Sequence, residues 1–211
     1  MLSDATARSS ATLQVAVREM RLIFERILLA AGVPEGLVPA VRECAVASAA
    51  VGLGGFEMLC EEHERIGAES KRALQLDQTG TTTTLDAQGQ HAWLVAPAAL
   101  DIAVDIAAIA GAGHLELRNV RCARELGVME GLAHRHGARA TVTAGTDHAT
   151  VSLTIHRPPQ SLQTWDPVLH RAVHSGVAVD SDLWWELHRM SARALAPDSV
   201  ASRRHAGPVI V

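Results

Sequence analysis

The fold is decided by the stretch Ala96-Pro97-Ala98-Ala99-Leu100-Asp101-Ile102-Ala103-Val104-Asp105-Ile106-Ala107-Ala108-Ile109-Ala110-Gly111. Pro97 is typical of a first helical turn and Gly111 of the position just past a helix end, so the stretch predicts a helix. Apolar side chains surround this helix except along the line of Asp101 and Asp105. A helix that is apolar around most of its circumference must be covered on several sides, so we expect it at the centre of the core.

β-Forming segments flank this helix along the chain. Before it, short strands are predicted around Leu76, over 81–85 and over 92–95, and the polar threonine run in the second favours an edge or surface strand. After it, 114–120 alternates as a strand, and a helix is expected from about Cys122 to His136. Residues 138–143 and 149–155 alternate on either side of a turn at 144–147, which predicts a hairpin.

The two ends of the chain are predicted to be mainly helical. Apolar residues spaced three and four apart predict helices over about 10–31, after Pro34 as far as Gly52, and over 56–66. Beyond the linker that Pro158-Pro159 begins, we expect a short helix at 166–174, a short strand at 177–179 and a last helix capped by Asp180 or Ser181 and stopped by Pro197.

These elements predict an α+β protein. Residues 1–67 form a helical N-terminal unit, and residues 68–211 form an α/β body in which a mixed β-sheet is packed with helices and followed by a C-terminal helix and tail. We expect the two parts to make one compact fold. A chain of 211 residues with 48% hydrophobic and only 3% aromatic residues must build its core from small aliphatic side chains.

Charge and composition indicate which kinds of binding partner the protein is not expected to have. A formal net charge of −4 provides no basic field for a phosphate backbone, so no nucleic-acid partner is expected. No apolar run reaches the roughly 18 residues of a membrane span, and the first residues lack signal-peptide features, so we expect a cytoplasmic protein with no membrane contact. Cys44, Cys60 and Cys122 are odd in number and widely spaced, which favours buried free thiols over disulfides or a zinc site.

Four acidic or imidazole side chains are candidate acid/base groups: Asp101, Asp105, His114 and His148. Asp101 and Asp105 lie four apart on one helix face, where they either act together on a proton or a cation or form the solvent-facing stripe of the helix. The solvent stripe is the favoured interpretation, because aspartate is usually exposed.

Candidate binding groups for a small anion are Arg118 near the middle of the chain and Ser199, Ser202 and Arg203 in the tail. The tail residues either close over an anion or form a capped turn with a surface arginine. His170 and His174 have the spacing of a metal-binding pair on a helix, but no third ligand accompanies them, so surface histidines are favoured and no metal site is predicted.

Two resemblances to known families extend this interpretation. The segment Leu183-Trp184-Trp185-Glu186-Leu187, followed by Pro197-Asp198-Ser199-Val200-Ala201-Ser202-Arg203, resembles the closing motif of a family of uncharacterised bacterial proteins of about this length. That family is a domain of unknown function, so the resemblance implies a fold and no chemistry.

The second resemblance is remote and is to the malate/lactate and sulfolactate dehydrogenases that lack a Rossmann domain. Ala31-Gly32-Val33-Pro34-Glu35 and the helix after it are similar to their opening, and Leu117-Arg118-Asn119 before a helix is similar to their strand ending in Arg-Asn-Ser-x-His. Where that family has Ser-His-Gly with a catalytic histidine, this chain has Gly55-Phe56-Glu57, and Cys122 falls where a second histidine would. The resemblance therefore implies a related fold without the hydride-transfer residues, and no cofactor is predicted.

Two functions remain open from the sequence. The first is a non-catalytic subunit or small-molecule-binding module on a degenerate enzyme-like fold. The second is a metabolic enzyme acting on a small carboxylate, with the four acid/base candidates and with Arg118 or Arg203 as the anion site. The enzyme requires at least three of these groups within about 5 Å in one pocket. The small residues, the four tryptophans and the apolar end at 208–211 favour a homodimer or a place in a larger assembly.

Overall fold

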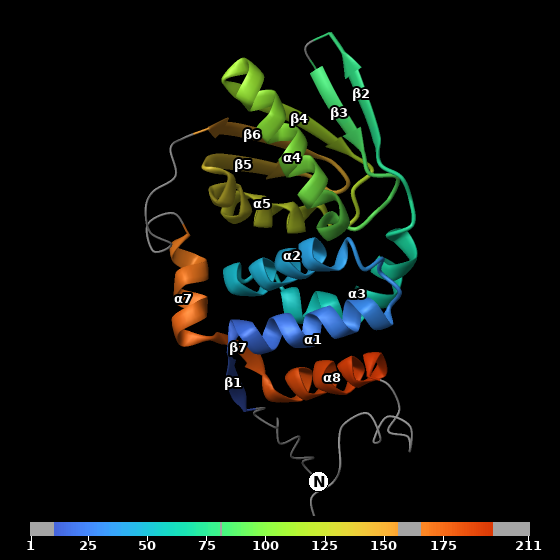
Figure 1. The fold of residues 1–211 in the computed structure, drawn as a ribbon, viewed down its shortest axis with the longest axis vertical. Helices are drawn as coiled ribbons and strands as arrows, with labels where there is room; N and C mark the ends of the chain where they lie inside the picture. The colour runs from blue at the N-terminus through green and yellow to red at the C-terminus, as the bar shows by residue number, and fades with distance from the viewer. Residues whose placement is uncertain (1–10, 81, 156–165, 196–211) are drawn as a thin grey trace, which may run out of the picture.

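The computed structural model describes residues 11–80, 82–155 and 166–195, and it has a helical half and a sheet half (Figure 1). The helical half contains α1 (Val17–Ala30), α2 (Val38–Val51) and α3 (Gly55–Glu69), and α2 is the layer next to the sheet half. The C-terminal helix α8 (Ser181–Ser191) packs against α1 and α3, far along the chain from both. The α+β fold predicted from the sequence is confirmed.

Two further elements complete the helical half. Strand β1 (Thr12–Val15) pairs antiparallel with β7 (Val177–Asp180), and α7 (Pro167–Ser175) lies beside α2. Asp180 caps α8 by accepting hydrogen bonds from two backbone N–H groups, as the sequence predicts. A short 3-10 helix, η3 (Ala192–Ala194), follows α8. The linker at Pro158-Pro159 and the stop at Pro197 lie outside the described residues.

The sheet half is built on five strands in the order β2-β3-β4-β6-β5. Their bounds are Gln75–Thr79 for β2, Thr82–Asp86 for β3, Ala112–Arg118 for β4, Ala138–Ala144 for β5 and Ala149–Ile155 for β6. Only the β3–β4 pair is parallel among these strands. The predicted hairpin is confirmed, because the turn between β5 and β6 closes with a hydrogen bond from Gly145 N–H to His148 O.

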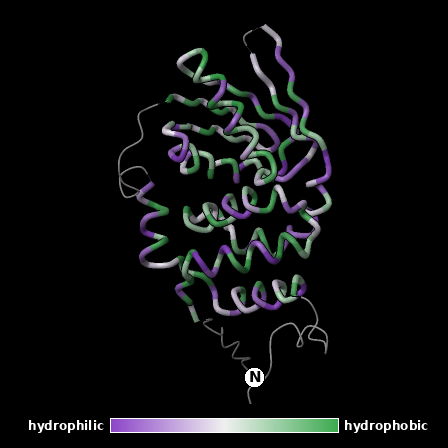
Figure 2. Tube along the Cα trace, viewed as in Figure 1, coloured by the Kyte–Doolittle hydropathy of each residue, from purple (hydrophilic) through white to green (hydrophobic). Residues whose placement is uncertain are grey.

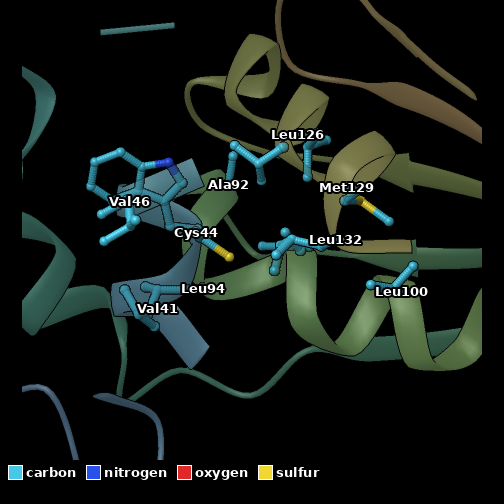
Figure 3. Close-up of a cluster of buried hydrophobic side chains, with 14 of the residues drawn as sticks. Val41, Cys44, Val46, Ala92, Leu94, Leu100, Leu126, Met129 and Leu132 are labelled. Carbon is cyan, nitrogen blue, oxygen red and sulfur yellow. The ribbon is translucent and has the colours of Figure 1, made fainter. Parts of the chain in front are cut away.

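Helix α4 (Ala92–Ala110) is the central helix that the sequence predicts, but it begins earlier than expected. The predicted strand over 92–95 is wrong. His91 caps the helix, because its Nδ1 accepts a hydrogen bond from Trp93 N–H (3.1 Å), so Pro97 lies inside the helix rather than in its first turn. The early part of α4 is buried in the cluster drawn in Figure 3, where side chains of α2, such as Cys44, meet those of α5 (Val128–Leu132).

Three other predicted elements differ in detail. The first helix begins at Val17 rather than near residue 10, because Thr12–Val15 pairs with β7. The helix predicted over 122–136 is divided into η1 (Ala123–Gly127), α5 and η2 (Ala133–His136). The threonine-rich strand β3 is not an edge strand, because β2 pairs with one side of it and β4 with the other.

The strands alternate between a covered face and an open face, and hydrophilic and hydrophobic residues interleave along them, whereas α4 is mainly hydrophobic (Figure 2). Helix α4 packs on β4 and β6 from the covered side, where Leu115, Leu117 and Val151 are buried. Apart from Ala112, the pairing register places only polar side chains on the open face, and all of them are exposed or half-buried. Any pocket on this face is therefore polar.

Helix α4 is also the one helix of the described ranges that is long and apolar enough to cross a membrane. Nine of its residues are buried, and the helix packs on the sheet. Its apolar composition is thus explained by its place in the core of the fold.

Candidate functional site

The sequence-predicted site residues lie in several places. Asp101 and Asp105 are exposed on α4, and Asp101 lines a cavity of about 240 Å³ together with residues of α2 and η2. His114 lies on the open face of the sheet, with its Nδ1 3.2 Å from Ser152 Oγ. Arg118 and His148 meet in one pocket. Ser199, Ser202 and Arg203 lie outside the described residues.

The pocket that brings Arg118 and His148 together lies at the end of β4, and we call it the β4-end pocket. It has a volume of about 450 Å³. Its lining is Glu116, Leu117, Arg118, Asn119, Asp147, His148, Ala149 and Thr150.

The backbone around the β5–β6 turn fixes one side of this pocket. Asp147 O accepts a hydrogen bond from Val120 N–H (2.8 Å), which ties the turn to the residues after β4. The ring of His148 lies over Gly145, where an added Cβ would come within 2.4 Å of the imidazole. Only glycine leaves room for the ring in this position.

Charged groups of both signs line the pocket. Arg118 Nη2 lies 2.8 Å from Glu116 Oε2, and His148 Nδ1 lies 3.2 Å from Asp147 Oδ1. Asn119 has a left-handed backbone (φ 54°), and its side-chain N–H donates to Asp86 Oδ2 (2.9 Å). The sequence pointed to Arg118 and His148, but it missed Glu116 and Asp86, whose proximity depends on the pairing of β4 with β3 and β6.

A partly buried ion cluster, centred on the buried carboxylate of Glu69, includes the residue Arg121, which follows this pocket along the chain. Arg121 forms a bidentate ion pair with Glu69, in which Nε donates to Oε1 (2.8 Å) and Nη2 donates to Oε2 (3.0 Å). Its Nη1 donates to Glu62 Oε2 (2.7 Å). Glu69 also accepts the backbone N–H of His91 (2.8 Å). Glu62 is half-buried, because Arg121 covers its carboxylate. The cluster joins α3 to the start of α4 and is structural.

His91 is fully buried, and its environment keeps the ring neutral. Burial, assisted by the positive charges of Arg121 and Arg65, lowers the pKa of His91 from 6.5 to about 3. Because Nδ1 accepts from Trp93 N–H, the ring proton of the neutral form is on Nε2. This imidazole serves as a helix cap and is not placed to exchange protons with a ligand.

We expect the buried His91 to make the protein less stable in acid. The unfolded chain binds a proton at this residue below about pH 6.5 and the folded chain does not, so stability falls by about 1.4 kcal/mol per pH unit as pH drops from 6.5 towards 3. The variant His91→Asn keeps a capping acceptor and removes the titration. Urea unfolding of both proteins between pH 7 and pH 4.5 tests this. The unfolding free energy of the wild type should fall relative to that of His91→Asn as pH drops, and a difference that does not change with pH would contradict the prediction.

The two positions that the dehydrogenase resemblance assigns to histidines hold no imidazole. Phe56 is 4% exposed and packs edge-to-face against Phe24 (ring centroids 5.6 Å apart) and Trp184 (6.3 Å). Cys122 lies in a left-handed backbone turn (φ 55°), with its Sγ 3.6 Å from Arg121 Nη1, and burial raises the pKa of its thiol. Neither side chain can accept a proton from a substrate alcohol near neutral pH.

Metal ligands are not gathered in the described part of the chain, where no group of three or more histidine, cysteine, aspartate or glutamate side chains is placed to hold an ion. The rings of His170 and His174 lie 4.2 Å apart on α7, and His174 Nδ1 approaches the His170 carbonyl oxygen (2.8 Å). The described cysteines are free thiols, as the sequence predicts. Cys44 is buried as expected, whereas Cys60 and Cys122 are only half-buried.

Comparison with solved structures shows what the fold is similar to. It is similar to the fold of malate/lactate dehydrogenase-like proteins. No protein-family model matches the chain, and no curated protein sequence does.

Three solved structures illustrate the likeness. A putative malate/lactate dehydrogenase from E. coli has a TM-score of 0.62 at 8% identity, over 92% of this chain and 99% of that one. The malate dehydrogenases from Pyrococcus horikoshii OT3 and Entamoeba histolytica have TM-scores of 0.52 and 0.50 at 16% and 18% identity, over 71% and 63% of this chain. The chain spans only 49% and 40% of those two proteins. At these identities the likeness extends to the fold alone.

Proposed function

We propose that the protein is a non-catalytic subunit or small-molecule-binding module built on a dehydrogenase-like fold. The observation that carries this proposal is Phe56, which the sequence resemblance aligns with a catalytic histidine and which lies in a buried aromatic cluster. Hydride transfer to or from an alcohol carbon needs a group that takes up or supplies the hydroxyl proton. A phenyl ring cannot do so, and Cys122 at the second position has a raised pKa.

The distribution of the candidate polar groups also supports a binding role. An enzyme would bring at least three of them within reach of one substrate. Among the described candidates, only Arg118 and His148 line the β4-end pocket. Asp101 and Asp105 are exposed on α4, and His114 lies nearer the start of β4. Scattered polar groups suit a module that holds a ligand without transforming it.

A metabolic enzyme acting on a small carboxylate is the alternative, and the β4-end pocket is the observation that favours it. In that case Arg118 holds the carboxylate of the substrate and His148, oriented by Asp147 (3.2 Å), moves the proton. The two proposals differ in turnover: the enzyme turns over a small carboxylate and loses that activity in His148→Gln, whereas a binding module shows no turnover in either form.

Titration with NADH tests the proposed loss of nicotinamide chemistry at the level of binding. Trp93 and Trp184 are buried in the two halves of the fold and report on ligands by fluorescence. We expect no saturable quenching by millimolar NADH or NADPH after correction for absorbed light, with free tryptophan as the control. Saturable quenching would show that the cofactor site survives and would weaken the proposal.

We also propose that the protein is a cytoplasmic homodimer or a subunit of a larger assembly, and that its C-terminal motif marks it as a relative of the uncharacterised bacterial family. Large apolar side chains at the described surface support the assembly, among them Ile109 (90% exposed) and Trp185 (53%). Light scattering at micromolar concentration should give at least twice the mass of the chain, 22.4 kDa. A clean monomer would contradict the homodimer.

A further inference from the structure

We propose that the β4-end pocket binds a small zwitterion, a molecule that carries an ammonium group next to a carboxylate. This inference rests on the proposed binding function, because it names the ligand class of the same pocket. It follows from the charges that line the pocket, from the weakness of the ion pair between them and from the size of the space.

The charges of the pocket suit a ligand with both signs. One guanidinium, that of Arg118, is accompanied by the carboxylates of Glu116 and Asp147, and Asp86 lies opposite Arg118 on the neighbouring strand. A ligand with a carboxylate alone would bring a further negative charge among these groups, and like charges about 4 Å apart repel by about 1 kcal/mol even in water. An ammonium group on the same ligand removes this repulsion.

The existing ion pair can open to admit such a ligand. The side chains of Arg118 and Glu116 are 62% and 45% exposed, and exposed pairs of this kind contribute at most about 1 kcal/mol. A ligand carboxylate can therefore replace Glu116 at the guanidinium, and Glu116 is then free to accept the ligand ammonium. Arg118 and Glu116 then each keep a partner of opposite sign.

The rest of the pocket suits a polar ligand of small-molecule size. The volume is about 450 Å³, Thr150 and Asn119 add polar groups, and only Leu117 and Ala149 are apolar. In the described ranges, no phenylalanine or tryptophan side chain lines the space. A divalent cation is a poorer occupant, because the described residues offer no cluster of three metal ligands here.

Three probes of similar size separate the charge classes: L-alanine, propionate and ethylamine. We expect L-alanine to shift the backbone amide signals of Asn119 and His148 saturably in ¹⁵N-correlated spectra at millimolar concentrations. Propionate lacks the ammonium and ethylamine lacks the carboxylate, so each should bind at least about tenfold more weakly.

Two variants assign the selectivity to the proposed groups. Glu116→Gln removes the partner of the ligand ammonium, so the affinity for L-alanine should fall to about that for propionate. The affinity for propionate itself should stay the same or rise. Arg118→Gln should abolish binding of both carboxylates. Glu19→Gln on the exposed face of α1 changes the net charge equally and should leave all three affinities unchanged.

The outcomes test the zwitterion ligand and the non-catalytic function separately. Propionate binding as tightly as L-alanine, a preference that survives in Glu116→Gln, or no response to any probe overturns the zwitterion as ligand and leaves the absence of hydride-transfer chemistry standing. Saturable NADH binding with turnover of a 2-oxo acid overturns the non-catalytic function instead, whichever probe the pocket prefers.

Discussion

Replacing Arg121 with methionine is expected to lower the free energy of unfolding by about 3–5 kcal/mol, because it removes the main cationic partner of a buried carboxylate, that of Glu69. The side chain of Glu69 is 2% exposed, and Arg121 supplies two of the groups that neutralise it. Arg65 also reaches Glu69 (3.1 Å), but its own side chain is 62% exposed, so we expect it to compensate only in part.

Two controls make this prediction specific. Arg118→Met removes an arginine whose ion pair is exposed and should cost at most about 1 kcal/mol. The double variant Glu69→Gln with Arg121→Met removes both charges and should be more stable than Arg121→Met alone. Urea unfolding measures all three, and a loss below about 1 kcal/mol for Arg121→Met would show that the cluster does not hold α3 to the sheet half.

The second large effect is expected from Gly113→Ala, at the contact between the central helix and the sheet. A Cβ at Gly113 would lie 2.3 Å from Ala103 O and 3.4 Å from the Ala107 side chain, so α4 would have to move away from β4. We expect a loss of about 3 kcal/mol, at the upper end of what overpacking costs, or failure to fold.

Gly36→Ala is the matched control for that substitution. An added Cβ there meets nothing within 4 Å, and the backbone of Gly36 is not left-handed. Its unfolding free energy should change by at most about 0.5 kcal/mol. Thermal unfolding of both variants compares them, and an equal, small effect in the two would contradict the close packing of α4 on the sheet.

The sequence predicted those parts of the fold that depend on local pattern. The alternation over 138–143 and 149–155 and the apolar stretch ending at Gly111 predicted β5, β6 and the end of α4 correctly. The start of α4 was missed because histidine is an unusual cap, and Trp93 and Val95 suit a strand as well as a buried helix. Thr12–Val15 was missed as a strand because its partner, β7, is more than 160 residues away along the chain.

The candidate site was predictable only in part, because most of its geometry is long-range. Arg118 and His148 were recognised one by one, but their meeting depends on the antiparallel register in which Glu116 faces Thr150. The pairing of Arg121 with Glu69 joins residues 52 positions apart and leaves no periodic signal. The substitution of Phe56, in contrast, could be interpreted from the sequence, because it depends on identity at one position.

The central claim is that the chain keeps a dehydrogenase-like fold without hydride-transfer chemistry. The most direct test is NADH and NADPH oxidation by the purified protein with a panel of 2-oxo acids, including pyruvate, oxaloacetate and sulfopyruvate, measured beside a catalytically active member of the dehydrogenase family. We predict consumption indistinguishable from the rate without protein for every acid. Turnover of any of them that scales with protein concentration and survives repurification would contradict the claim.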